Sequence, residues 1–525
     1  MREFALSVAV LAASVGLFAT VTFAGVADTN HNLGFYSPGS VKSPDTTEIC
    51  IFCHTPHVAD PTGPNWNKSD PGSTYTFTPG TSVVAIPGSP DGASKLCLSC
   101  HDGTVALGSL LNLPGFATGG TFPMDGTVAG KLSSASTTNL QTDLRDDHPI
   151  SFSYDQSYPD NTEFNAPGSN NEFSPRSTPS DMMTVSLDSE GKVQCTSCHD
   201  AHNNVNGNFL VSPLEDAALC TYCHNKRYWT TIDGTGSVHY TSTANWDATG
   251  TNPWQMDLGS AGYTDDDPAT HECLACHISH NGAAGMELTT GVNPVLPSEV
   301  GEEWTCLVCH TGTVAALDIE AEVDKTYGHG IKDATYYGRH TPSRGAAGEP
   351  AREDAVDLVR ENQHAECVDC HNPHGAKSGN HIIGGLVIGD TTGNRIGPNM
   401  LGGWGVKPTS WPNLGVGGDN TVSPFGYSII DFDSLTLAPE KFEGHMCIKC
   451  HSSYAYGVDP INRVEVPSGN GAGLLAYQED ITKSMNINNL GFHPVFGQGR
   501  NQPPSTANAN WPAGGDGLSN TFAYV

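Results

Sequence analysis

Hydrophobic residues are sparse along this 525-residue chain, at 37% of the composition, and only one long apolar run is present. That run follows Arg2 at the N-terminus and ends in small residues, with Thr22 and Ala24 suited to a signal-peptidase site. It predicts a cleavable signal peptide over residues 1–24, with a retained membrane anchor as the alternative. No later segment approaches the roughly 20 apolar residues of a membrane span. We therefore expect an exported chain that has no membrane span once the signal is cleaved.

Beyond residue 24, apolar residues occur in short stretches that 59 glycines and 35 prolines interrupt. With charged residues at only 15%, this pattern predicts mostly loops, with short helices and a few small β-hairpins. The clearest β-branched runs lie in a glycine-rich insertion at 382–408, which predicts one or two hairpins. Because so many ordered loops need something to pack around, we expect a core that is not made of protein.

The formal net charge is −32 with histidine neutral. A surface of this sign repels nucleic acid and anionic lipid, so neither is expected as a partner. The charge suits the attraction of basic partners or cations, and it equally suits the simpler role of keeping an exported protein in solution.

The chain has 16 cysteines, and all of them fall into eight C-x-x-C-H motifs, numbered 1 to 8 here in chain order. A disulfide framework has no reason to place a histidine after each pair. Zinc sites and redox dithiols also use C-x-x-C, but eight copies in an exported chain favour the attachment motif of c-type haem. We therefore predict eight covalently bound c-type haems, which would form most of the hydrophobic interior. The attachment cysteines are Cys50, Cys53, Cys97, Cys100, Cys195, Cys198, Cys220, Cys223, Cys273, Cys276, Cys306, Cys309, Cys367, Cys370, Cys447 and Cys450. The proximal iron ligands are His54, His101, His199, His224, His277, His310, His371 and His451.

Motifs 1, 3, 5 and 7 continue as C-x-x-C-H-x-x-H, whereas the even-numbered motifs do not. This alternation divides the chain into four haem pairs, at 25–146, 147–232, 233–326 and 327–525, the last with the glycine-rich insertion. A second histidine one helical turn past the proximal ligand cannot easily reach the far face of the same ring. We expect it to ligate the iron of a neighbouring haem, although a surface or hydrogen-bonding role is the alternative. These second histidines are His57, His202, His280 and His374.

Four further distal ligands are needed if every iron has two histidines. The best candidates lie in the loops between motifs, roughly one to a pair, and are His148, His239, His340 and His493. His329 competes with His340, and His31 competes with His493. His271, His364 and His445 each precede a motif by two or three residues, where packing or hydrogen bonding at the haem edge is expected instead.

Three stretches carry a resemblance to a known family: "CIFCHTPH…WN…LCLSCHDGTVALG", "DDHPISF" and "QCTSCHDAHNN…FL…LCTYCH". They resemble bacterial multihaem cytochromes of the doubled C-x-x-C-H class, which are typical of metal-respiring bacteria. The resemblance is strongest over residues 50–224 and does not cover the long loops. It implies bis-histidine haems stacked into a chain, acting in periplasmic or extracellular electron transfer with redox proteins or metal minerals as partners. "ATYYGRH" at 334–340 is faintly similar to exported polymeric cytochromes, which implies a homopolymer.

Three functional hypotheses follow. The first is an electron conduit without a substrate site. The second is an octahaem oxidoreductase that acts on nitrogen or sulfur oxyanions at one open haem, with Arg339 beside His340 as the place to look. The third is a secreted polymer that conducts through the same haem chain. All eight motifs end in histidine, spare histidines are plentiful and basic residues for anion binding are scarce, which favours the conduit.

Overall fold

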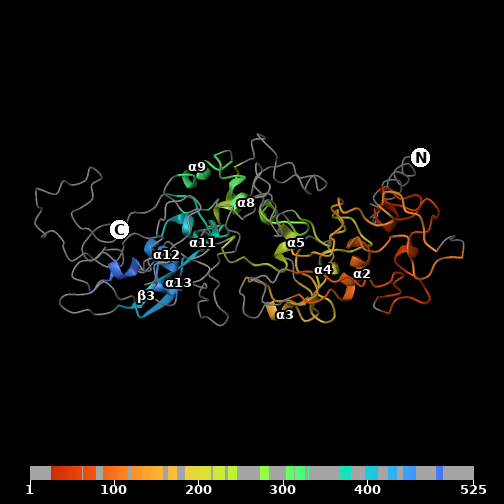
Figure 1. The fold of residues 1–525 in the computed structure, drawn as a ribbon, viewed down its shortest axis with the longest axis horizontal. Coiled ribbons are helices and arrows are strands. Elements are labelled where there is room, and N and C mark those ends of the chain that lie inside the picture. The colour runs from red at the N-terminus through yellow and green to blue at the C-terminus, as the bar shows by residue number, and fades with distance from the viewer. Residues whose placement is uncertain are drawn as a thin grey trace, which may run out of the picture.

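A computed structural model describes most of the chain between residues 25 and 488. The described residues are 25–61, 63–77, 87–115, 120–157, 163–173, 184–214, 217–226, 228–230, 235–244, 272–282, 303–312, 314–325, 329, 331, 367–379, 396–411, 424–433, 441–456, 481–486 and 488. They form an elongated body in which the chain advances in sequence order from one end to the other (Figure 1). The predicted signal peptide lies outside the described residues.

Short helices are joined by long irregular segments, as the glycine and proline content predicted. The α-helices are α2 (Gly92–His101), α3 (Tyr154–Ser157), α4 (Cys195–Cys198), α5 (Ala218–Thr221), α6 (Val238–Thr241), α8 (Glu303–Leu307), α9 (Ile319–Val323), α11 (Cys367–Cys370), α12 (Glu443–Cys450) and α13 (Ser453–Tyr456). The 3₁₀ turns are η1 (Val26–Asp28), η2 (Cys50–Phe52), η6 (Glu272–Ala275), η9 (Pro398–Met400) and η10 (Ile481–Met485). None of the described helices is long and apolar enough to cross a membrane.

Each C-x-x-C-H motif begins on one of these helical turns, as expected from the sequence. In seven motifs the histidine N–H donates to the carbonyl of the first cysteine, at 2.8–3.1 Å, which closes one helical turn. Residues three and four apart lie on the same face of such a turn. The local sequence spacing therefore brings both thiols and the following histidine to one side of the backbone.

Two small antiparallel sheets are present among the described residues. Strand β1 (Phe152–Ser153) pairs with β2 (Lys192–Val193), and β3 (Trp404–Ser410) pairs with β4 (Gly426–Asp431). Strand β3 begins near the end of the glycine-rich insertion, and its partner lies beyond that insertion. Strand β3 packs on α12. A Cβ at Gly405 would come within 2.7 Å of the His445 backbone, so only glycine allows the strand to approach the helix this closely.

Within the described ranges, apolar side chains gather in several small clusters and do not form one continuous core. One cluster centres on Phe52 and Phe122, and another on Tyr154 and Phe173. Motif cysteines lie at the edges of the clusters, with Cys53 and Cys100 against the first, Cys223 against the second and Cys370 against a third. The clusters thus flank the attachment motifs, where the predicted non-protein core would lie.

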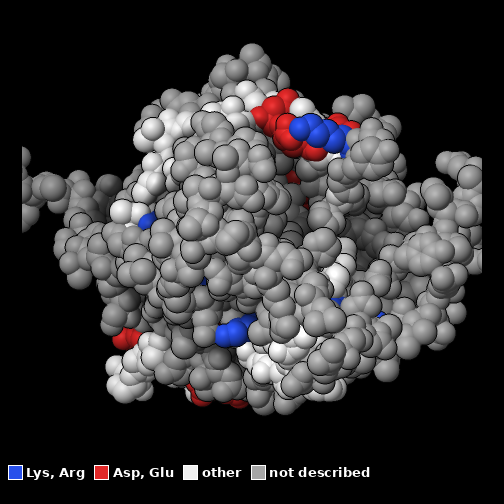
Figure 2. Space-filling view, turned by 90° about the vertical axis from the view of Figure 1, so that its left-hand side faces the viewer, with Lys and Arg blue, Asp and Glu red and all other residues white. Residues whose placement is uncertain are grey.

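In the view of Figure 2, acidic side chains form a patch at the upper edge of the molecule, beside basic side chains, where α9 lies. Asp318 caps the first turn of α9 through the Ala321 N–H, and Glu322 forms an ion pair with Lys325. This exposed acidic cluster agrees with the negative net charge of the whole chain.

Candidate functional site

The thiols of the eight motifs are all described, and none forms a disulfide. Sulfurs from successive motifs approach one another. The hydrogen bond to Cys195 and burial raise the pKa of the Cys97 thiol, and the same contact lowers the pKa of Cys195 to about 7. A hydrogen bond to Cys220 likewise raises the pKa of Cys273. Motifs 2 and 3, and motifs 4 and 5, therefore meet through their first cysteines.

Electrostatic interactions between other sulfurs continue this series. Burial and then the nearby Cys100 raise the pKa of Cys53 to about 12, which places motifs 1 and 2 next to each other. Three further pairs of neighbouring sulfurs join motifs 3 and 4, motifs 5 and 6, and motifs 7 and 8. They are Cys198 with Cys223, Cys276 with Cys309, and Cys370 with Cys447. His310 and His371 interact between motifs 6 and 7. The motifs are therefore arranged in space in the order in which they occur in the sequence.

Histidine rings face one another in pairs at a nearly constant separation. Among the described residues, seven motif histidines have a second histidine whose ring centroid is 6.1–6.2 Å away. The interplanar angles range from 2° to 83°. The pairs are His54 with His202, His101 with His31, His199 with His280, His224 with His148, His277 with His374, His310 with His239, and His451 with His329.

This geometry fits two imidazoles that share one metal between them. Direct stacking gives a shorter distance, such as the 4.0 Å between His31 and Phe209. Two imidazole–metal bonds of about 2.0 Å, with roughly 1 Å more from each nitrogen to its ring centre, span about 6 Å. Rotation about the nitrogen–metal bonds leaves that distance unchanged, which accounts for the wide range of interplanar angles. With two thiols beside each motif histidine, the residues fit a covalently attached haem.

The pairing follows a regular rule along the chain. The proximal histidine of the first motif in each of the first three pairs faces a histidine from the next pair, namely the second histidine of that pair's C-x-x-C-H-x-x-H site. In the second motif of a pair, the histidine faces a loop histidine that precedes the same pair. The doubled-site partners are His202, His280 and His374, and the loop partners are His31, His148, His239 and His329. His31 and His329 are the two positions that the sequence ranked second.

The remaining candidate histidines occupy other positions. His57 is exposed, and no histidine ring faces it among the described residues. His371 likewise has no histidine ring facing it within the described ranges. His340 and His493 lie outside the described residues. His445 is 1% exposed and its Nδ1 accepts the Phe442 N–H, so it caps α12 beside motif 8.

Hydrogen bonds at Nδ1 orient the paired rings. Among the described residues, backbone carbonyls accept from the Nδ1–H groups at 2.8–3.2 Å in His31, His54, His101, His148, His199, His239 and His371. Because a carbonyl can only accept, this bond leaves the Nε2 lone pair free for a metal. His280 differs, because its Nδ1 donates to the Asp147 carboxylate at 3.1 Å. Asp147 was not singled out from the sequence, although it directly precedes His148 in "DDHPISF".

Burial lowers the pKa of several of the paired imidazoles, which favours their neutral form. It lowers the pKa of His199 to about 4, and the pKa values of His224 and His374 to about 3. The pKa values of His148 and His310 are lowered for the same reason. A neutral imidazole has the lone pair that metal ligation requires.

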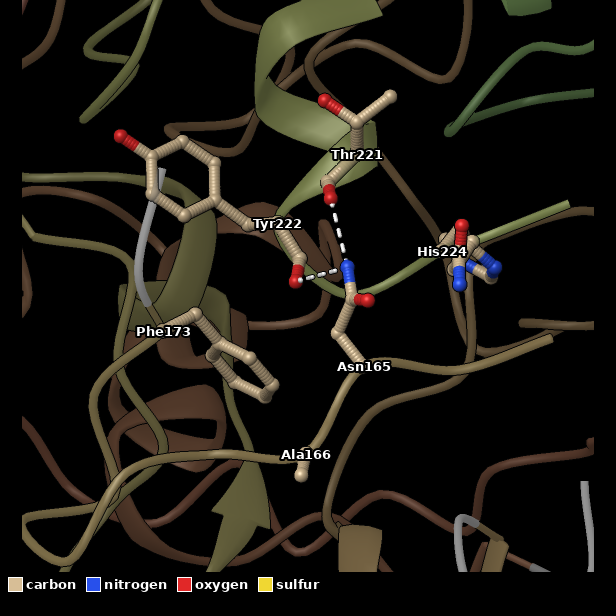
Figure 3. A pocket seen from close by; sticks show the side chains of 7 residues that line it. Asn165, Ala166, Phe173, Thr221, Tyr222 and His224 are labelled. Carbon is tan, nitrogen blue, oxygen red and sulfur yellow. Dashed lines mark hydrogen bonds between the residues drawn. The ribbon is translucent and has the colours of Figure 1, made fainter. Parts of the chain in front are cut away.

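A cavity of about 290 Å³ lies beside motif 4 (Figure 3). Thr221, Tyr222 and His224 line it from the motif, and Phe173 closes it on another side. The Asn165 side-chain amide donates to the carbonyls of Thr221 and Tyr222 at 2.9 and 3.0 Å, which ties a separate loop to the motif backbone. The cavity borders the His224 ring and provides space for part of a flat prosthetic group.

A family model described as the doubled CXXCH motif matches residues 189–227, which contain motifs 3 and 4. This chain carries the motif of multihaem c-type cytochromes. The paired motifs indicate covalently bound c-type haem and electron transfer, in a class of proteins that is typically exported. The cytochrome class predicted from the sequence is thereby supported, while the number of eight haems stays a prediction. A search of curated proteins found no match.

Proposed function

We propose that the protein is an exported electron conduit with eight c-type haems, each attached to one C-x-x-C-H motif. The observation that carries this proposal is the set of histidine pairs separated by 6.1–6.2 Å. Two imidazoles on one iron leave no position for a substrate, so the paired histidines favour electron transfer over catalysis. When bound, the haem irons supply one-electron ferric–ferrous couples.

The polypeptide orders and insulates these redox centres. Neighbouring thiols such as those of Cys97 and Cys195 would hold successive haems next to each other, so the haems would follow one another along the molecule. Where a carbonyl accepts from Nδ1–H, as in His101 and His199, it fixes the orientation of the imidazole and increases its basicity. Redox proteins or metal minerals at either end are the proposed partners.

A second candidate function follows from one observation. His371 has no facing histidine among the described residues, and an iron with one histidine could bind a small molecule. An octahaem oxidoreductase acting on nitrogen or sulfur oxyanions would use such a site.

Carbon monoxide distinguishes the two functions. The purified holoprotein should contain eight haems by mass, and its oxidised EPR spectrum should contain only low-spin signals. If the reduced protein takes up no carbon monoxide, the conduit is supported. If one haem takes up the gas, the oxidoreductase is favoured. Uptake by several haems would refute the bis-histidine assignment itself.

A further inference from the structure

His31 belongs to the first haem pair, but its ring is held by a loop of the second pair. Its Nδ1 donates to the Ala201 carbonyl at 3.2 Å, the longest of the seven Nδ1 bonds to backbone carbonyls among the described residues. The ring also stacks on Phe209, with centroids 4.0 Å apart and planes 17° apart. Trp66 and Trp229, by contrast, lie edge-on to their histidines at 5.9 and 6.0 Å. Phe209 therefore lies flat against the ring whose hydrogen bond is longest.

Phe209 ends a turn with an unusual backbone conformation. Gly207, Asn208 and Phe209 have φ values of 75°, 47° and 58°. Glycine adopts the left-handed region freely, whereas a bulky residue does so only where surrounding contacts hold it there. The Asn204 side chain accepts from the Phe209 N–H, and the Phe209 carbonyl accepts from the Asp200 N–H, both at 2.7 Å. Such strain is concentrated at functional sites, which makes the turn a candidate for a functional role.

The same turn holds an axial ligand of the following haem. The Asn208 carbonyl accepts from the His199 Nδ1–H at 2.9 Å. The next residue, Phe209, stacks on His31, which faces the motif 2 histidine His101. Two adjacent residues thus contact a ligand of the motif 3 haem and a ligand of the motif 2 haem.

The stacked ring opposes one particular motion of His31. An imidazole on iron can rotate about its nitrogen–metal bond, so contacts with the surrounding protein must set its plane. An aromatic ring that lies flat on one face of the imidazole resists this rotation. The planes of His31 and His101 are 66° apart. Without the Phe209 ring, the 3.2 Å bond to Ala201 would remain to hold that angle.

We propose that the turn at residues 207–209 sets the imidazole orientation at two successive haems, those of motifs 2 and 3, with Phe209 as the positioning residue for His31. This inference rests on the proposed function, because it requires a haem iron between the paired histidines. Ring orientation sets the splitting of the iron orbitals, and axial ligation is one of the means by which a protein tunes a haem. The turn links the electronic states of the two haems at the junction of the first and second pairs.

The low-spin EPR signals of the oxidised full-length holoprotein test this role. His31→Ala and His280→Ala each remove one axial ligand, so the signals that they lose identify the motif 2 and motif 3 haems. Phe209→Leu should shift the g values of the motif 2 signal, and Phe209→Tyr, which keeps the ring, should leave them unchanged. Phe164→Leu is the matched control, because Phe164 is also half-buried and contacts a motif histidine, His224, at 4.9 Å. It should leave the motif 2 and motif 3 signals unchanged.

Asn204→Ala gives a second test that keeps the Phe209 ring. It removes the acceptor of the Phe209 N–H, so it should shift the motif 2 and motif 3 signals together. The proposal would be overturned if Phe209→Leu left the motif 2 signal unchanged, if Phe164→Leu shifted that signal equally, or if Asn204→Ala shifted neither signal. In each of these cases, a wild-type protein with only low-spin haems would leave the electron conduit standing. Wild-type protein with several gas-binding haems would refute the bis-histidine assignment and this inference with it.

Discussion

Asp147 is predicted to lower the reduction potential of the haem between His199 and His280. Its carboxylate is buried, with Oδ1 accepting from the His280 Nδ1–H at 3.1 Å and from the Asn281 N–H at 3.2 Å. A negative acceptor draws the ring proton toward itself and makes the imidazole a stronger donor to iron. Since ferric haem carries one more positive charge than ferrous haem, the carboxylate stabilises the oxidised form.

The magnitude follows from the change of acceptor in Asp147→Asn. A hydrogen bond to a charged group contributes about 1.5–3 kcal/mol, and a neutral one contributes about 1 kcal/mol. The lost difference, about 1 kcal/mol, corresponds to about 40 mV in a one-electron couple. Asparagine can still accept from Nδ1–H through its side-chain oxygen, so the substitution chiefly removes charge.

Potentiometric titration of the holoprotein, followed by visible and EPR spectra, measures the effect. One haem should shift upward by about 40 mV, with the haem content unchanged. Asp200→Asn is the matched control, because that carboxylate lies 3.4 Å from the Nδ1 of His202, whose side chain is 70% exposed. Because solvent screens this exposed pair, the shift in reduction potential in Asp200→Asn should be less than about half of that in Asp147→Asn. An unchanged or lowered potential in Asp147→Asn would refute the reasoning.

Three further predictions concern spectra and stability. The imidazole planes are 2–32° apart where the second histidine comes from a doubled site, and 45–83° apart where it comes from a loop. Because ring orientation sets the splitting of the iron orbitals, the oxidised protein should give two classes of low-spin EPR signal, and a single class would contradict the pairing. Lys68 is fully buried, and its Nζ donates to three backbone carbonyls at 2.7–3.4 Å. Lys68→Met should cost roughly 3 kcal/mol by leaving these carbonyls unsatisfied, which a lower denaturant midpoint would report. Burial lowers the pKa values of His199, His224 and His374 to about 4, 3 and 3, whereas the unfolded value is about 6.5. The unfolded chain therefore binds more protons between pH 6.5 and 4, and stability should fall as the pH is lowered through this window. If the denaturant midpoint stays constant across this pH window, these histidines do not contribute to the pH dependence of stability.

The attachment chemistry could be predicted from the sequence because it is local. Two cysteines three residues apart and a histidine one residue later occupy a single helical turn, so the C-x-x-C-H spacing alone brings these groups together. The loop-rich fold was equally predictable, since frequent glycine and proline prevent long helices and wide sheets. The alternation of doubled and plain motifs also predicted four repeating units along the chain.

The assignment of facing histidines was decided by the tertiary structure. His148 and His239 were recognised in their loops, but His31 and His329 could not be ranked above His493 and His340 from sequence context. A histidine in a loop carries no local signal of the ring that it will face, because that depends on how loops of unequal length fold back. Only the fold places His277 opposite His374 across a long stretch of sequence. Covalent attachment is thus determined within five residues, whereas axial pairing requires the long-range packing that brings separate repeats to a common centre.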